Sequence, residues 1–159
     1  MTSEPQEQTQ RAARAASAVT EVIEVLWGRG REATTAPVSP SQLKVLFVLE
    51  NEDGVNLRNV TERLGSTAPS TSRLCDRLEA VGFVNRTPSP ISRRELRLWL
   101  TDEGRSFLQD LRDRREKELR KVISRMPPGK QTMLLEGLVS FHEAAAQDRG
   151  ADARDPRPA

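Results

Sequence analysis

The stretch that decides the fold consists of Leu57-Arg-Asn-Val-Thr-Glu-Arg-Leu-Gly65, Ser70-Thr-Ser-Arg-Leu-Cys-Asp-Arg-Leu-Glu79 and Arg93-Arg-Glu-Leu-Arg97. The first two pieces carry apolar residues at helical spacing on either side of a glycine turn, and the third alternates as a strand does. A short helix, a tight turn, a second helix and a basic β-ribbon predict a winged helix-turn-helix. That shape puts one helix into a DNA major groove and a loop onto the backbone beside it.

The second helix of this motif has a core side and a polar side. Thr67 is predicted to cap the helix, and Gly82 to end it. The core side is predicted to hold Thr71, Leu74, Leu78 and Val81. The opposite face is small and polar near its N-terminus, which suits close approach to base edges. Its members are Pro69, Ser72, Arg73, Asp76 and Ala80, with Arg77 on the flank.

Two strands are predicted after this helix, at Phe83–Arg86 and Glu95–Leu100. The loop between them contains two prolines and then Arg93-Arg94. Because strand side chains alternate between the two faces, the three leucines of the second strand are predicted to face the core. These are Leu96, Leu98 and Leu100, so that Arg97 and Trp99 would point outward.

Helices are predicted on both sides of this middle third. One runs over Gln10–Arg31, one opens at Ser39-Pro40, a long one follows Thr101, and a last one follows the break at Pro127-Pro128-Gly129. The predicted fold class is mostly α with a small β-wing (α+β). Its winged helix-turn-helix head has N- and C-terminal helices that form a dimerisation base, because two-fold pairing buries their apolar stripes. The predicted boundaries are tails at 1–9 and 148–159, a helical dimerisation region at 10–36 and 102–147, and the DNA-binding region at 37–101.

The positive charge of the chain is concentrated in the same motif. Residues 63–97 hold seven Lys/Arg against three acids, residues 1–62 six against nine, and residues 98–159 twelve against eleven. A localised basic patch is the electrostatic footprint of a polyanion, so it favours a nucleic-acid partner over a merely solvated surface.

Cellular context follows from what the composition excludes. One cysteine allows no disulfide framework within the chain and fits a reducing compartment. No apolar run approaches the roughly 20 residues that span a bilayer, and the polar, acidic N-terminus is no secretory signal. We expect a cytoplasmic protein with no membrane partner.

The predicted DNA-contacting residues lie on the second helix and the wing. They are Thr67, Pro69, Ser70, Ser72, Arg73, Arg77, Arg86, Arg93 and Arg94. Arg73 either contacts DNA or pairs with Asp76, and its outward position favours DNA. Arg86 and Arg97 suit DNA contact and a bridge between strand neighbours equally well. Ser70 is closer to a capping role, and Ser72 is closer to the groove.

Other candidate chemistries are weaker. Cys75 lies at the edge of the apolar side of its helix, which favours a small buried residue over a redox switch. His142, the only histidine, has no companions at metal-ligand spacing, and no nucleophile–base pair is recognisable. We therefore expect no metal, no cofactor and no enzymatic activity. Trp27 and Trp99 suit a small-molecule pocket or simple packing, and packing is the safer interpretation.

The chain resembles the MarR family of winged-helix transcriptional regulators. The resemblance rests on Thr61-Glu-Arg-Leu-Gly65, on residues 70–84, and on Arg93-Arg94 leading into Leu100-Thr-Asp-Glu-Gly104, and it extends over residues 10–147. It implies a dimer with interlocked terminal helices and recognition helices in successive major grooves. In the family the wing carries Asp-x-Arg, whose arginine enters the minor groove. Here Arg94 holds the place of that arginine and Ser92 that of the aspartate.

These observations predict a homodimeric, sequence-specific DNA-binding regulator on a pseudo-palindromic operator, a repressor released by a small-molecule effector. The alternative is a winged-helix protein-interaction module without DNA binding. The polar face with Arg73 argues against that module, since interaction surfaces more often expose apolar anchors.

Overall fold

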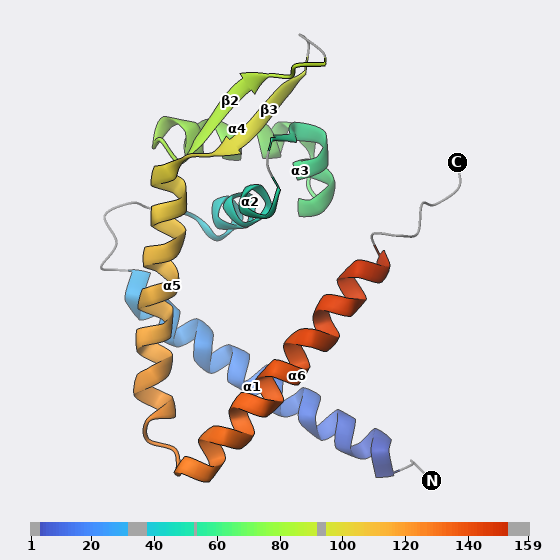
Figure 1. Cartoon of the computed structure of the whole chain (residues 1–159), viewed down its shortest axis with the longest axis vertical. Coiled ribbons are helices and arrows are strands. Elements are labelled where there is room, and N and C mark those ends of the chain that lie inside the picture. The colour runs from blue at the N-terminus through green and yellow to red at the C-terminus, as the bar shows by residue number, and fades with distance from the viewer. Residues whose placement is uncertain (1–3, 32–37, 53, 92–94, 153–159) are drawn as a thin grey trace. The chain divides into compact units, whose positions relative to one another are not determined.

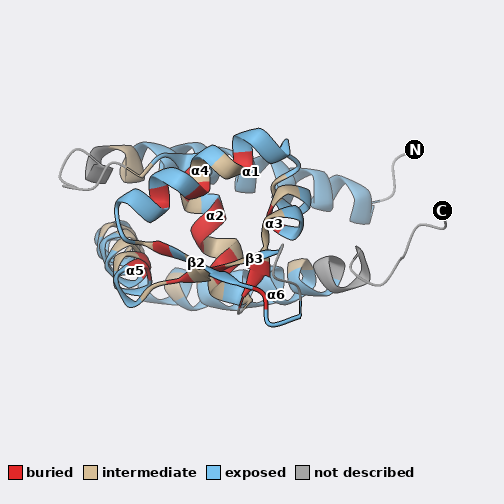
Figure 2. Cartoon of the chain, turned by 90° about the horizontal axis from the view of Figure 1, so that it is seen from above, coloured by how far each residue is buried: buried red, intermediate tan, exposed pale blue. Residues whose placement is uncertain are grey.

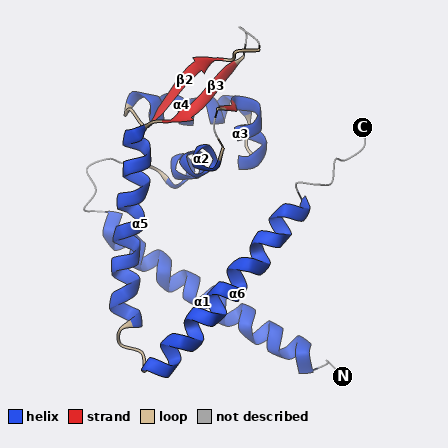
Figure 3. Cartoon of the chain, viewed as in Figure 1, coloured by secondary structure: helices blue, strands red, loops and turns tan. Residues whose placement is uncertain are grey.

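The computed structural model describes residues 4–31, 38–52, 54–91 and 95–152. For residues 29–31 and 148–152 it describes the backbone only. Contacts between residues divide the chain into two compact units, residues 1–115 and 116–159. The elements are α1 Glu4–Arg31, α2 Pro40–Asn51, β1 Val55–Asn56, α3 Leu57–Leu64, α4 Ala68–Ala80, β2 Val84–Pro88, β3 Leu96–Leu100, α5 Asp102–Ile123 and α6 Pro128–Asp152 (Figures 1 and 3). The predicted class, mostly helical with a small β-wing, is confirmed.

Local signals in the sequence set the helix ends of the head. The backbone N–H of Ser39 donates to Gln42 Oε1 over 2.8 Å, and the N–H of Gln42 donates to Ser39 Oγ over 3.2 Å, so that α2 begins with a capping box. Helix α3 ends at Gly65, whose φ of 56° lies in the left-handed region that glycine adopts without strain. Helix α2 therefore begins, and helix α3 ends, where the sequence predicts.

The outer helices extend beyond their predicted ends. Helix α1 starts at Glu4, inside the segment predicted as a tail, and α6 continues to Asp152. Glu4 and Glu7 lie in the first turn of α1, where negative charge complements the helix dipole. This favourable charge supports a helix start earlier than the apolar spacing predicts.

The sheet of the head has three antiparallel strands in the order β1-β3-β2. Strand β2 pairs with β3 from Val84↔Leu100 to Pro88↔Leu96, which forms the wing. Strand β1 pairs along the other edge of β3, and its second residue, Asn56, lies opposite Arg97. Strand β1 was not predictable from the sequence, because two residues are too few to show a period of alternation.

The core lies between α2, α3, α4, α5 and the sheet. Its buried apolar residues are Val45, Leu46, Leu49, Val55, Val60, Cys75, Leu78, Val84, Leu98, Leu100 and Leu108 (Figure 2). Two residues predicted to face the core do not: Val81 is 50% exposed and Leu96 is 48% exposed. Val81 follows the last residue of α4, where the helical geometry stops. Leu96 pairs with Pro88 in the last residue pair before the loop of the wing.

Helix α5 is joined to the rest of the first unit by two arginines. Arg112 donates to both carboxylate oxygens of Glu50 on α2, over 2.8 and 2.5 Å, and its guanidinium lies 5.9 Å from the ring centre of Phe47. The hydrogen bond from Arg112 is the main reason why the pKa of Glu50 is lowered. One turn on, the Arg115 guanidinium lies 4.1 Å from the ring centre of Trp27, so this tryptophan packs between α1 and α5.

Candidate nucleic-acid interface

The first turn of α4 is held by its own side chains. Thr67, the N-cap, accepts a hydrogen bond from the Ser70 N–H at its Oγ1 over 3.4 Å, and its hydroxyl lies 3.1 Å from Ser70 Oγ. The Thr67 carbonyl accepts from the Thr71 N–H over 2.9 Å. Thr67 and Ser70 are thus occupied with capping in the free protein. This agrees with the expectation that Ser70 lies closer to a capping role.

One face of α4 is open to solvent. Thr71, Cys75 and Leu78 are buried on the opposite face, which fixes the orientation of the helix. The exposed predicted contacts are Thr67, Pro69, Ser70, Arg73 and Arg77, with Ser72 partly exposed. Figure 2 shows the same alternation as red core positions between pale-blue turns of α4. Six of the nine predicted residues therefore lie together on this helix.

Arg86 lies in a different environment from the arginines of α4. From β2, its Nη2 is 2.5 Å from Asp76 Oδ1 and its Nε is 3.4 Å from Glu79 Oε2, both on α4. Its side chain is only 23% exposed. Of the two roles left open for this residue, the geometry favours an internal bridge, here between β2 and α4. Asp76, the alternative partner considered for Arg73, contacts Arg86.

The tip of the wing is only partly described. Arg93 and Arg94, together with Ser92, lie outside the described residues, so their predicted roles stay predictions. On the described side of the loop, Ser89 is buried, and its N–H donates to the Glu95 carbonyl over 2.7 Å. Its Oγ accepts from the Ile91 N–H over 3.3 Å.

The inner edge of the wing carries contacts that sequence reasoning missed. Trp99 Nε1 donates to Thr87 Oγ1 over 2.7 Å, and its ring covers Gly54 so closely that a Cβ there would lie 2.7 Å from Cζ2. Arg97 Nη1 donates to the Gly54 carbonyl over 3.3 Å. Both side chains, predicted to point outward, are half-buried. Gly54, with φ +68°, was the available signal, because a glycine before a strand often marks a close approach.

Cys75 is fully buried, and burial raises the pKa of its thiol to about 11. A thiol with so high a pKa forms almost no thiolate at neutral pH. The environment therefore fits the structural role expected for Cys75.

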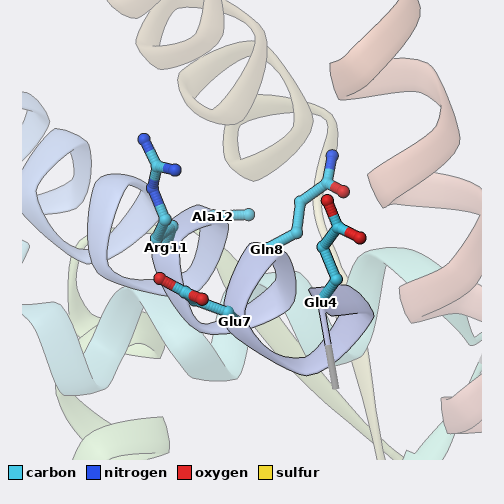
Figure 4. A pocket seen from close by; sticks show the side chains of 5 residues that line it. All are labelled: Glu4, Glu7, Gln8, Arg11 and Ala12. Atoms are coloured by element: carbon cyan, nitrogen blue, oxygen red, sulfur yellow. The ribbon is translucent and has the colours of Figure 1, made fainter. Parts of the chain in front are cut away.

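The remaining features point to no second site. Among the described residues, no group of three or more His, Cys, Asp or Glu is placed to hold a metal, and no helix is long and apolar enough to cross a membrane. A hollow near the start of α1 is lined by Glu4, Glu7, Gln8, Arg11 and Ala12 (Figure 4). All five belong to one exposed helix surface, which provides no enclosing walls for a ligand.

The helix pair α3–α4 and the β2–β3 ribbon beside it define a winged helix-turn-helix protein. Residues 38–96 match the model of the MarR family. The family comprises transcriptional regulators rather than enzymes, which agrees with the prediction of a regulator.

The chain is 30% identical over 101 residues to the uncharacterized HTH-type transcriptional regulator YfiV of Bacillus subtilis. This match covers 64% of the chain and 63% of YfiV, which is less than two thirds of that relative. Among solved structures, Rv1404 from Mycobacterium tuberculosis has a TM-score of 0.73 at 26% identity, covering 83% of this chain and 90% of Rv1404. The PcaV transcriptional regulator of Streptomyces coelicolor, solved with its natural ligand, has a TM-score of 0.51 at 23% identity, covering 90% of this chain and 94% of PcaV.

Proposed function

We propose that the protein is a homodimeric, sequence-specific regulator that binds double-stranded DNA through α4 and the wing. The observation that carries this is the open face of α4, which has small polar side chains at its start and the exposed Arg73 and Arg77 further along. Small residues let the helix approach base edges, and the arginines supply contacts to phosphates or guanine. A regulator of this kind acts on chromosomal DNA, so we place it in the cytoplasm.

The dimer is supported by apolar side chains that each unit leaves exposed. In the first unit these include Val19, Val22 and Val25 of α1. In the second unit they include Met133, Leu135, Leu138, Val139 and Phe141 of α6. Exposed apolar area of this extent on long helices is unusual for a monomer, and a second copy of the chain would cover the same surfaces twice. Light scattering should give twice the chain mass at micromolar concentration, and a monomer would refute the dimer.

We further propose that the dimer is a repressor that a small molecule releases. A protein seated on an operator excludes other proteins from that stretch of duplex, which is the simplest route to repression. Release by a ligand is supported by PcaV, which was crystallised with its natural ligand. A reporter placed behind the recovered operator should be silenced by the protein. A screen of small organic compounds for loss of operator binding should find the class that releases it.

The test of DNA binding is selection from a random duplex library. The wild type should enrich an imperfect inverted repeat whose half-site centres are about 10 bp apart, or a multiple of that spacing, since each subunit presents one recognition helix. Arg73→Ala should cost more on the enriched duplex than on a scrambled one. Arg77→Ala, at the flank of the face, serves as the matched control and should weaken both more evenly. If a folded wild type enriches no sequence and binds no duplex, the protein-interaction module becomes the better account.

A further inference from the structure

One side chain at the base of the wing has two partners that lie far apart in the sequence. Asn56 is the last residue of β1 and the N-cap of α3, and its Oδ1 accepts from the Asn59 N–H over 2.8 Å. Its Nδ2 donates to Glu95 Oε1, also over 2.8 Å. A side-chain amide has one accepting and one donating end, so the cap and the contact with Glu95 use different atoms. Asn56 can therefore serve both partners at once.

Glu95 lies at the base of the wing loop and is held from two sides. Its backbone carbonyl accepts from the Ser89 N–H on the β2 side, and its carboxylate reaches the start of α3. Backbone pairing between β1 and β3 ends at Asn56 and Arg97, because the chain turns into α3 at Leu57. Glu95 is two residues beyond the last pair, so the side chain of Asn56 extends this edge of the sheet where the backbone no longer can. Figure 3 shows the short β1 directly before α3 and beside β3.

We propose that Asn56 is a positioning residue for DNA binding, which fixes the base of the wing relative to the helix pair α3–α4. The inference rests on the proposed function, in which α4 and the wing engage one duplex together. Two elements that must fit the same rigid partner bind it best when their spacing is set beforehand. The contact is exposed to solvent, so it adds little to the stability of the head. Its effect is expected in DNA binding.

Asn56→Ser separates the two roles of this residue. Serine caps a helix about as well as asparagine, is neutral, and is too short to reach Glu95. The melting temperature should stay close to that of the wild type. Affinity for the duplex that the wild type enriches should fall about fivefold, with a smaller salt dependence because wing contacts are lost.

A rescue pair tests the contact itself. In Asn56→Asp with Glu95→Gln, one Asp oxygen caps α3 and the other accepts from the Gln amide, while the net charge equals that of the wild type. This pair should restore affinity. The control is Asn56→Ser with Glu95→Gln, which removes the same carboxylate but cannot form the contact, and it should stay weak.

The outcomes separate this inference from the proposed function. If the wild type enriches no duplex, the proposed function fails. If the wild type binds its duplex and Asn56→Ser binds equally well, Asn56 does not position the wing. Loss of affinity that follows a lowered melting temperature, with no rescue by the Asp/Gln pair, also overturns the inference, because Asn56 would then be only a helix cap.

Discussion

Replacing Arg86 by glutamine distinguishes an internal bridge from a DNA contact. The sequence assigns this arginine to DNA or to a bridge with equal weight, whereas the structure places it against Asp76 and Glu79 with 23% of its side chain exposed. A guanidinium occupied by two carboxylates within the chain has little left to offer a phosphate. We expect the variant to lose stability, whereas the salt dependence of its DNA binding should not change.

The size of both effects follows from the contacts. Two ion pairs at a partly exposed site contribute about 1–2 kcal/mol together to the free energy of unfolding, so Arg86→Gln should lower it by that amount. A phosphate contact contributes about 0.9 to the slope of log affinity against log salt, or about 1.8 for a dimer. Arg86→Gln should leave this slope unchanged and lower affinity by the same factor at every salt concentration.

The assay combines urea denaturation with binding to the enriched duplex at four or more salt concentrations. Arg77→Gln is the matched control, because Arg77 lies exposed on the same helix that Arg86 contacts. It should lower the slope by about 1.8 with little change in stability. The reasoning is refuted if Arg86→Gln flattens the slope as Arg77→Gln does and unfolds at the wild-type urea concentration.

Three further predictions concern the head and its junction with α5. Gly104→Ala should lower the free energy of unfolding by about 1–3 kcal/mol in urea denaturation, because the new Cβ would lie 2.4 Å from the Phe83 carbonyl oxygen. Gly28→Ala is the control and should not lower it, because a Cβ there meets nothing within 4 Å. Burial raises the pKa of the Cys75 thiol from 9.0 to about 11. The stability that the buried neutral thiol contributes is therefore complete below pH 9 and is lost as the pH rises towards 11. The difference in unfolding free energy between the wild type and Cys75→Ala should shrink over that range. The pKa of Glu50 is lowered from 4.5, so the stability that its carboxylate contributes is present above pH 4.5 and is lost as the pH falls below it. Glu50→Gln should therefore be less stable than the wild type at neutral pH, and the two should have the same unfolding free energy near pH 3.

The parts of the fold that local rules govern were predictable from the sequence. The start of α4 follows from Thr67 and Pro69, and the end of α3 from Gly65, because a cap or a left-handed turn needs only the residues next to it. The open face of α4 follows from the same local periodicity, which put Thr71 and Leu78 on the buried side. These elements carry most of the candidate interface.

Contacts between distant segments were not predictable in this way. Asn56 and Glu95 are 39 residues apart, and no spacing in the sequence shows that they meet. The prediction that Leu96 is buried was wrong for a related reason. Alternation tells which side a strand residue faces but not how far the covering helices extend along the strand. The same limit applies to Arg86, whose partners on α4 become visible only when β2 folds against that helix.

The structure shows which side chains the acids of the basic motif contact, and a count of charges cannot show this. Of the three acids among residues 63–97, Asp76 and Glu79 contact Arg86, and Glu95 contacts Asn56. Each of these contacts joins the wing to the helix pair. The acids therefore do little to weaken the positive face of α4, because their charge is directed at holding the two DNA-binding elements in one arrangement. In the proposed function the negative residues of the motif set the geometry in which its exposed arginines meet the duplex.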